Sequence, residues 1–160
     1  MLWNPNNVSV NGFMLKVKEV APSLGIEPVE AHVQNAAEIE RAMAALSRDS
    51  NTGLIVPPDF TTVVNRAPII ALAAKHNLPV IYPFRLFAAS GGLISYGINL
   101  REMYVNAAAY FDRILRGENP ANLPVQAPTR YELVINLKAA KALGIDVPAN
   151  LLVTADGVIE

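Results

Sequence analysis

The sequence contains no cysteine, which excludes disulfide bonds, a thiol nucleophile and a zinc site built from thiolates. No stretch reaches the roughly 18–20 consecutive apolar residues that a membrane-spanning helix needs. Charged residues make up only 17% of the chain, the formal net charge is −1, and the lysines and arginines form no block. Because surfaces that bind nucleic acid carry clustered basic residues, the sequence predicts neither a nucleic-acid partner nor a membrane span.

The motifs of catalysis are missing as well. The two histidines, His32 and His76, have no neighbour at the spacing of metal ligands, which favours structural roles. Ser90 precedes two glycines, but no histidine is placed to activate it, and Glu38 and Glu40 lie on a helix expected to be exposed. The glycine-rich dinucleotide motif and the P-loop lysine are both absent. The sequence therefore predicts no catalytic residue, no metal and no cofactor.

Apolar residues are abundant instead. They make up 52% of the 160 residues, and the mean hydropathy is +0.27. A chain of this length forms one domain with a real core, and the apolar excess predicts that some apolar surface meets a partner. Residues 1–5 lack the basic and long apolar segments of a signal peptide, so a chain made in this form is expected to remain in the cytoplasm.

Strand-like and helix-like apolar patterns alternate along the chain. Strands and helices that alternate at this spacing predict an α/β fold with three layers, in which helices cover both faces of a parallel sheet. The proline-rich stretch 118–129 has no regular period and predicts an extended connector, and 148–160 predicts a short helix or turn. The expected strands are 2–3, 26–33, 53–56, 80–82, 93–97 and 131–136. The expected helices are 8–24, 36–48, a third that ends near 76, 100–116 and 137–143. Thr61 or Thr62 can cap the third helix, but Pro68 within its pattern indicates that the helix starts near residue 65 or 66.

Ligands of such folds bind beyond the carboxyl ends of the strands, which points to three loops. In the first loop, 4–9, amide and hydroxyl side chains can hold a carboxylate at a helix N-terminus, or Asn7 or Ser9 simply caps the helix. In the second loop, 57–61, Asp59 can pair with a ligand ammonium and Phe60 can cover an apolar group. Alternatively, Asp59 or Thr61 caps the following helix.

The third loop, 83–87, contains Arg85, which either grips a carboxylate with two hydrogen bonds or is an ordinary surface charge. None of the three loops supplies an acid paired with a base. Three polar and aromatic loops at one sheet edge therefore favour a binding site over a catalytic one.

Five segments together resemble the substrate-binding proteins of ABC transporters, the family that includes tryptophan- and tyrosine-type binding proteins. The resemblance covers nearly the whole chain, and its most specific part runs from the PVQ of the connector to the final ALG. The segments are LWNPNN at 2–7, GLISYG at 92–97, YFDRILRG at 110–117, NPANLPVQ at 119–126 and YELVINLKAAKALG at 131–144.

The resemblance implies the type I periplasmic binding protein fold, in which two α/β lobes joined by a hinge enclose a small, often amino-acid-like ligand. It also implies an ABC permease as partner and a location outside the cytoplasm. The ligand contacts it implies are Asn4, Asn6, Asn7, Ser9, Pro58, Asp59, Phe60, Thr61, Phe84 and Arg85, and the hinge residues are Tyr96, Gly97 and Asn99.

The chain resembles only the second half of such a protein, so it is expected to be truncated and to lack the first lobe. Residues 1–97 are expected to form the ligand-binding lobe, and residues 98–160 the hinge-crossing helix, the connector and a β-α tail. In the family, the helix at 100–115 packs mainly on the first lobe. Here its apolar stripe is expected to pack on a second copy of the chain, giving a homo-oligomer.

A half-cleft is expected to bind its ligand weakly, since closure of both lobes supplies the affinity. Two other functions stay open from the sequence. One is a ligand-sensing regulatory domain on the same fold, and the other is a small α/β enzyme, which would need a partner for Asp59 that the sequence does not reveal.

Overall fold

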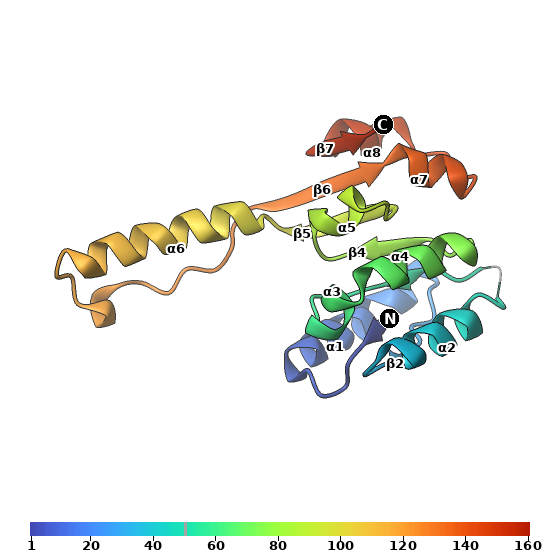
Figure 1. The fold of residues 1–160 in the computed structure, drawn as a ribbon, viewed down its shortest axis with the longest axis horizontal. Coiled ribbons are helices and arrows are strands. Elements are labelled where there is room, and N and C mark those ends of the chain that lie inside the picture. The colour runs from blue at the N-terminus through green and yellow to red at the C-terminus, as the bar shows by residue number, and fades with distance from the viewer. Residues whose placement is uncertain (50) are drawn as a thin grey trace.

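The computed structural model describes residues 1–49 and 51–160, and it has the expected alternation of strands and helices (Figure 1). The strands are β1 (Leu2–Trp3), β2 (Ala31–His32), β3 (Leu54–Ile55), β4 (Val80–Tyr82), β5 (Ile94–Ile98), β6 (Tyr131–Asn136) and β7 (Gly157–Ile159). The α-helices are α1 (Asn11–Val20), α2 (Ala36–Leu46), α3 (Phe60–Val64), α4 (Arg66–Lys75), α5 (Arg85–Ala89), α6 (Leu100–Leu115), α7 (Leu137–Ala142) and α8 (Ala149–Thr154), and the 3-10 helices are η1 (Val8–Val10), η2 (Ala21–Leu24) and η3 (Pro120–Asn122).

The strands form one sheet of five strands, in the order β3-β4-β5-β6-β7, and a separate parallel pair, β1-β2. All neighbours in the large sheet are parallel except β5 and β6. The predicted α/β architecture with a mainly parallel sheet is confirmed. The antiparallel pair arises because the chain leaves the end of β5 through α6 and re-enters the sheet from that same end.

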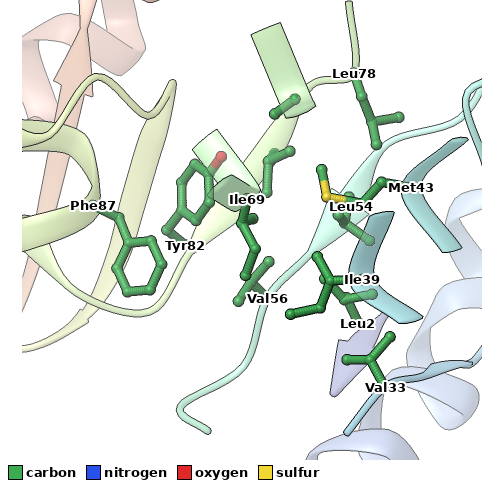
Figure 2. Close-up of a cluster of buried hydrophobic side chains, with 12 residues drawn as sticks. Leu2, Val33, Ile39, Met43, Leu54, Val56, Ile69, Leu78, Tyr82 and Phe87 are labelled. Carbon is green, nitrogen blue, oxygen red and sulfur yellow. The ribbon is translucent and has the colours of Figure 1, made fainter. Parts of the chain in front are cut away.

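One hydrophobic cluster joins the two groups of strands. Leu2 and Val33 come from the β1-β2 region, and both are fully buried together with Ile39 of α2, beside which Figure 2 shows them. Further along the cluster, the rings of Tyr82 and Phe87 stack with centroids 5.0 Å apart, and burial raises the pKa of the Tyr82 hydroxyl. Helices α2, α4 and α5 thus cover one face of the large sheet.

Trp3 points to the opposite side of β1 from Leu2, as alternation along a strand requires. There it packs with Met1, Val10 and Met14 against α1. Helix α1 therefore covers the other face of the strands at the β1 edge, so helices lie on both faces, as predicted.

Several boundaries differ from the sequence-based expectation. The expected helix at 8–24 is a series of η1, α1 and η2. The helix start expected near residue 65 or 66 is confirmed by α4, but a separate short helix, α3, precedes it. The cap of α3 is Asp59, not Thr61 or Thr62. The strand expected at 26–33 is reduced to β2 because only Ala31 and His32 lie in register with β1.

The end of the chain contains a strand that the sequence analysis missed. Residues 148–160 fold into α8 and then β7, which pairs with β6 in parallel. Asp156 starts the pairing: its N–H donates to the Leu133 carbonyl and its side chain accepts from the Leu133 N–H, both at 2.8 Å. Strands β6 and β7 thus lie in the same sheet as β3–β5, while the division of the chain at residue 97 stays a prediction.

Helix α6 and the connector extend as an arm from the ends of β5 and β6 (Figure 1). The connector is tied to the helix by the Tyr110 hydroxyl, which donates to the Pro124 carbonyl at 2.6 Å, and by the ion pair of Arg113 with Glu118. None of the 16 residues of α6 is buried. No helix in the described part of the chain is long and apolar enough to cross a membrane.

Candidate functional site

Two of the three predicted loops meet at the carboxyl ends of β1 and β3. The Asn4 side-chain amide donates to the Thr61 hydroxyl at 2.9 Å. The Asn7 side-chain amide donates to Oδ2 of Asp59 at 2.8 Å. Residues more than 50 positions apart in the sequence are thereby held together, so the first and second loops form one polar surface at this sheet edge.

The first loop is also fixed by its own side chains. Oδ1 of Asn4 accepts from the Asn6 N–H at 3.0 Å, and Oδ1 of Asn7 accepts from the Ser9 N–H at 3.2 Å. The second bond caps η1, which confirms the prediction that Asn7 can cap the helix after the first loop. Asn7 uses its oxygen for the cap and its nitrogen for Asp59, and one side chain therefore serves both the loop and the inter-loop contact.

Asp59 is the buried centre of this surface, with only 4% of its area exposed. Its Oδ1 caps α3 by accepting from the Thr62 N–H at 3.3 Å, while Oδ2 accepts from Asn7. The next residue, Phe60, is 80% exposed, and Pro58 before it is exposed as well. A buried carboxylate held by hydrogen bonds is thus followed in the chain by an exposed aromatic side chain.

The third loop is placed differently. Phe84 is half-buried and packs against the main core cluster. The guanidinium of Arg85 lies against Gly157 of β7, so close that a Cβ at Gly157 would be 2.8 Å from Nη1. Among the described residues, no hydrogen bond or ion pair joins Arg85 to the first two loops, because the short helix α5 directs it across the sheet toward β7.

The three predicted hinge residues lie where the arm joins the sheet. Tyr96 stacks on Tyr131 with ring centroids 5.8 Å apart. Asn99 accepts from the Glu102 N–H at 2.9 Å as the cap of α6, and its amide donates to Glu132 at 3.2 Å. Gly97 approaches the backbone of Pro83, and a cavity of about 240 Å³ lies beside this junction, lined by residues of α6 and of 126–130.

The histidines have local structural partners. His32 lies 2.9 Å from Glu30 and edge-on to Trp3, and the ring of His76 is 3.3 Å from the Ser47 hydroxyl. Hydrogen bonds from Lys18 and then His32 lower the pKa of the Glu30 carboxyl. No group of three or more potential metal ligands occurs in the part of the chain that the structure describes.

Removal of the Asp59 side chain is expected to cost about 1–3 kcal/mol of unfolding free energy, because Asp59→Ala takes away a helix cap and leaves the Asn7 amide without its partner. Urea unfolding followed by circular dichroism measures the loss. The control is Asn119→Ala, which removes only the exposed cap of η3 and is expected to cost less than about 1 kcal/mol. Equal losses in the two variants would contradict a stabilising role for the contact between the loops.

Comparison with known proteins bears on the whole chain. The tyrosine-binding protein of Clostridioides difficile (strain R20291) is 25% identical over 144 residues, which are 89% of this chain and 41% of that protein. A conserved domain protein of Vibrio cholerae O1 biovar eltor has a crystal structure with a TM-score of 0.87 at 28% identity, covering 98% of this chain and 53% of that one. An ABC domain from Streptococcus pneumonia, solved in complex with L-Trp, has a TM-score of 0.87 at 24% identity and shares its fold over 99% of this chain and 53% of its own.

The chain thus spans about half the length of the relatives it matches. Its fold, one α/β lobe of a substrate-binding protein, agrees with the expectation from the five sequence segments. Residues 1–159 match the description "ABC transporter substrate binding protein", and the chain belongs to that family.

Proposed function

We propose that the chain is one lobe of the solute-binding component of an ABC importer, and that it binds a small, amino-acid-like ligand reversibly and without chemistry. The observation that carries the proposal is the pair of hydrogen bonds that joins Asn4 to Thr61 and Asn7 to Asp59. These bonds give the two loops one shape before any ligand arrives, which lowers the entropy lost on binding.

The residues of this surface suit an amino acid. Phe60, whose side chain is largely exposed, offers an apolar contact to a ligand side chain. The Asp59 carboxylate is buried with both oxygens hydrogen-bonded, so in this proposal it attracts a ligand ammonium by its charge and without an open contact in the free chain. Asn6 and Ser9 add exposed polar groups at the rim. Phe84 and Arg85 stay predicted contacts, and Arg85 would have to swing away from Gly157 to take part.

Membership of the family supports the wider role. In this proposal the partner is an ABC permease, and the protein works outside the cytoplasm. A single lobe covers only one side of a ligand, so its affinity is expected to be weak, near a dissociation constant of roughly 1 mM, or about −4 kcal/mol.

The direct test is a thermal-shift and calorimetric titration of the chain with L-tryptophan and L-tyrosine, the ligands suggested by relatives. Phe60→Ala is expected to weaken binding about tenfold, because it removes an aromatic contact of roughly 1 kcal/mol or more. The melting temperature without ligand should not change, since the Phe60 ring packs on little of the protein.

The matched control is Val153→Ala on α8, another exposed apolar side chain, which should leave binding unchanged. Turnover of a test substrate together with no shift for any amino acid would overturn the proposal in favour of an enzyme. Binding that is unaffected by Phe60→Ala would place the ligand elsewhere and would refute the site.

A further inference from the structure

Helix α6 presents an apolar stripe that no described part of the chain covers. Tyr104 is 70% exposed and Phe111 64%, and Leu115 at the end of the helix is exposed to 71%. At 1.5 Å per residue the helix is about 24 Å long. An amphipathic helix of this kind normally buries its stripe, so this arm lacks a partner surface.

One face of the large sheet is also exposed. Ile55, Ile81 and Ile94 lie in register on neighbouring strands, on the face opposite the one that α2, α4 and α5 cover. Ile55 and Ile81 are 41% and 44% exposed, although strands of parallel sheets normally have helices on both faces. Among the described residues, no helix lies on this face over β3–β5.

The bare face forms the floor of a groove. A cavity of about 720 Å³ lies over Ile55 and Ile81, with Val17 of α1 and the segment 25–29 as one wall. Ile26 and Val29 in that wall are themselves more than half exposed. The groove is therefore apolar along its floor and one side, as a surface that receives a helix should be.

Charge also matches between the groove and the start of the helix. The groove lining contains two acidic side chains, Glu27 and Asp49, besides the N-terminal ammonium, which donates to the Val29 carbonyl. On α6, Arg113 and Arg116 are paired with Glu118 and Asp112, whereas Arg101 makes no ion pair with any described residue. Arg101 is therefore the cation of α6 that the acidic side chains of a groove can attract.

The helix cannot reach the groove of its own chain. It begins beyond the carboxyl end of β5 and runs away from the sheet (Figure 1), whereas the groove lies toward the amino ends of β3, β4 and β5, around Gly53, Pro79 and Leu93. An occupant from the same sequence must come from another copy.

We propose that two copies of this chain form a symmetric dimer in which α6 of each copy lies in the β3–β5 groove of the other. The same contact is made twice about a two-fold axis, so the interface closes and does not propagate into a filament. Because the contact is made twice, each copy contributes both a helix and a groove to the interface. Two contacts together come closer to the area of about 800 Å² that stable interfaces bury on each partner. This inference is independent of the ligand proposed above.

Light scattering after size-exclusion chromatography tests the dimer at micromolar concentration. Phe111→Glu on the helix and Ile81→Glu on the groove floor should each weaken dimerisation by roughly a hundredfold, because each places an unpaired charge in an apolar contact. Both side chains are exposed in the single chain, so the variants should fold, which circular dichroism checks. The control Val64→Glu, an exposed site on α3, should remain dimeric.

The absence of cysteine permits a second test by cross-linking. Ala108→Cys on α6 and Ile26→Cys in the groove wall are made as two separately tagged single variants, mixed, and treated with a short bismaleimide. A cross-link between the two tags is expected. A monomer at all concentrations, a dimer that survives Ile81→Glu, or cross-links only between copies of Ala108→Cys would each overturn the proposal.

Discussion

Gly97→Ala is expected to remove more than about 3 kcal/mol of unfolding free energy, a large share of the ~5–15 kcal/mol that a domain possesses. A Cβ at position 97 would lie 1.9 Å from the carbonyl oxygen of Pro83, and 3.0 Å from its carbonyl carbon. Both obstacles are backbone atoms of a buried residue, so no side-chain rotation relieves the clash. Strand β5 would have to separate from the end of β4, where the sheet joins the arm.

Urea unfolding measures this loss, and Gly12→Ala is its matched control. A Cβ at Gly12 of α1 meets nothing within 4 Å, and the position is helical. Alanine there should stabilise the chain by up to ~1 kcal/mol, because it restricts the unfolded state and favours the helix. If the two variants changed stability by similar amounts, the close approach of β5 to Pro83 would be wrong.

Asn136→Asp is expected to cost about 3–5 kcal/mol near pH 7, because it replaces a buried amide by an uncompensated carboxylate of the same shape. Asn136 is 5% exposed at the junction of β6 and α7. Its amide donates to the Ala88 carbonyl at 3.0 Å, and its Oδ1 caps α7 by accepting from the Ala139 N–H at 3.0 Å. The carboxylate keeps the cap but sets a charged oxygen against the Ala88 carbonyl.

The cost should depend on pH with a defined sign. Burial and the facing carbonyl raise the folded-state pKa of the introduced carboxyl above its unfolded value of about 3.9. Below that value both states are protonated, the O–H can donate to Ala88, and the variant should approach the wild type. The deficit should grow as the pH rises above it and level off above the folded-state pKa.

The comparison is made against the wild type at each pH, which cancels the general effect of acid. Asn119→Asp serves as control, because Asn119 also caps a helix, η3, but is exposed. Its unfolding free energy should stay within about 0.5 kcal/mol of the wild type at every pH. A deficit in Asn136→Asp that did not change with pH would show that the bond to Ala88 contributes little.

The candidate site was predictable from sequence only in part. The polar loop after β1 and the Pro-Pro-Asp-Phe loop after β3 follow from the rule that ligands bind at the carboxyl ends of strands. That Asn7 both caps η1 and reaches Asp59 could not be read from the sequence, because the two residues meet only once β1 and β3 share a core. The position of Arg85 likewise depends on β7, whose three residues have too short a pattern to predict a strand.

The sequence by itself determined the class of the fold and the absence of known catalytic motifs, because both depend on local patterns. Apolar periodicity sets strand or helix, and capping residues such as Asn99 mark where helices begin. The tertiary structure alone decided which strands are neighbours, that β5 and β6 run antiparallel, and that both the face of α6 and the face of β3–β5 stay uncovered. Those properties depend on contacts between distant residues, and a helical stripe looks the same in the sequence whether or not a partner covers it.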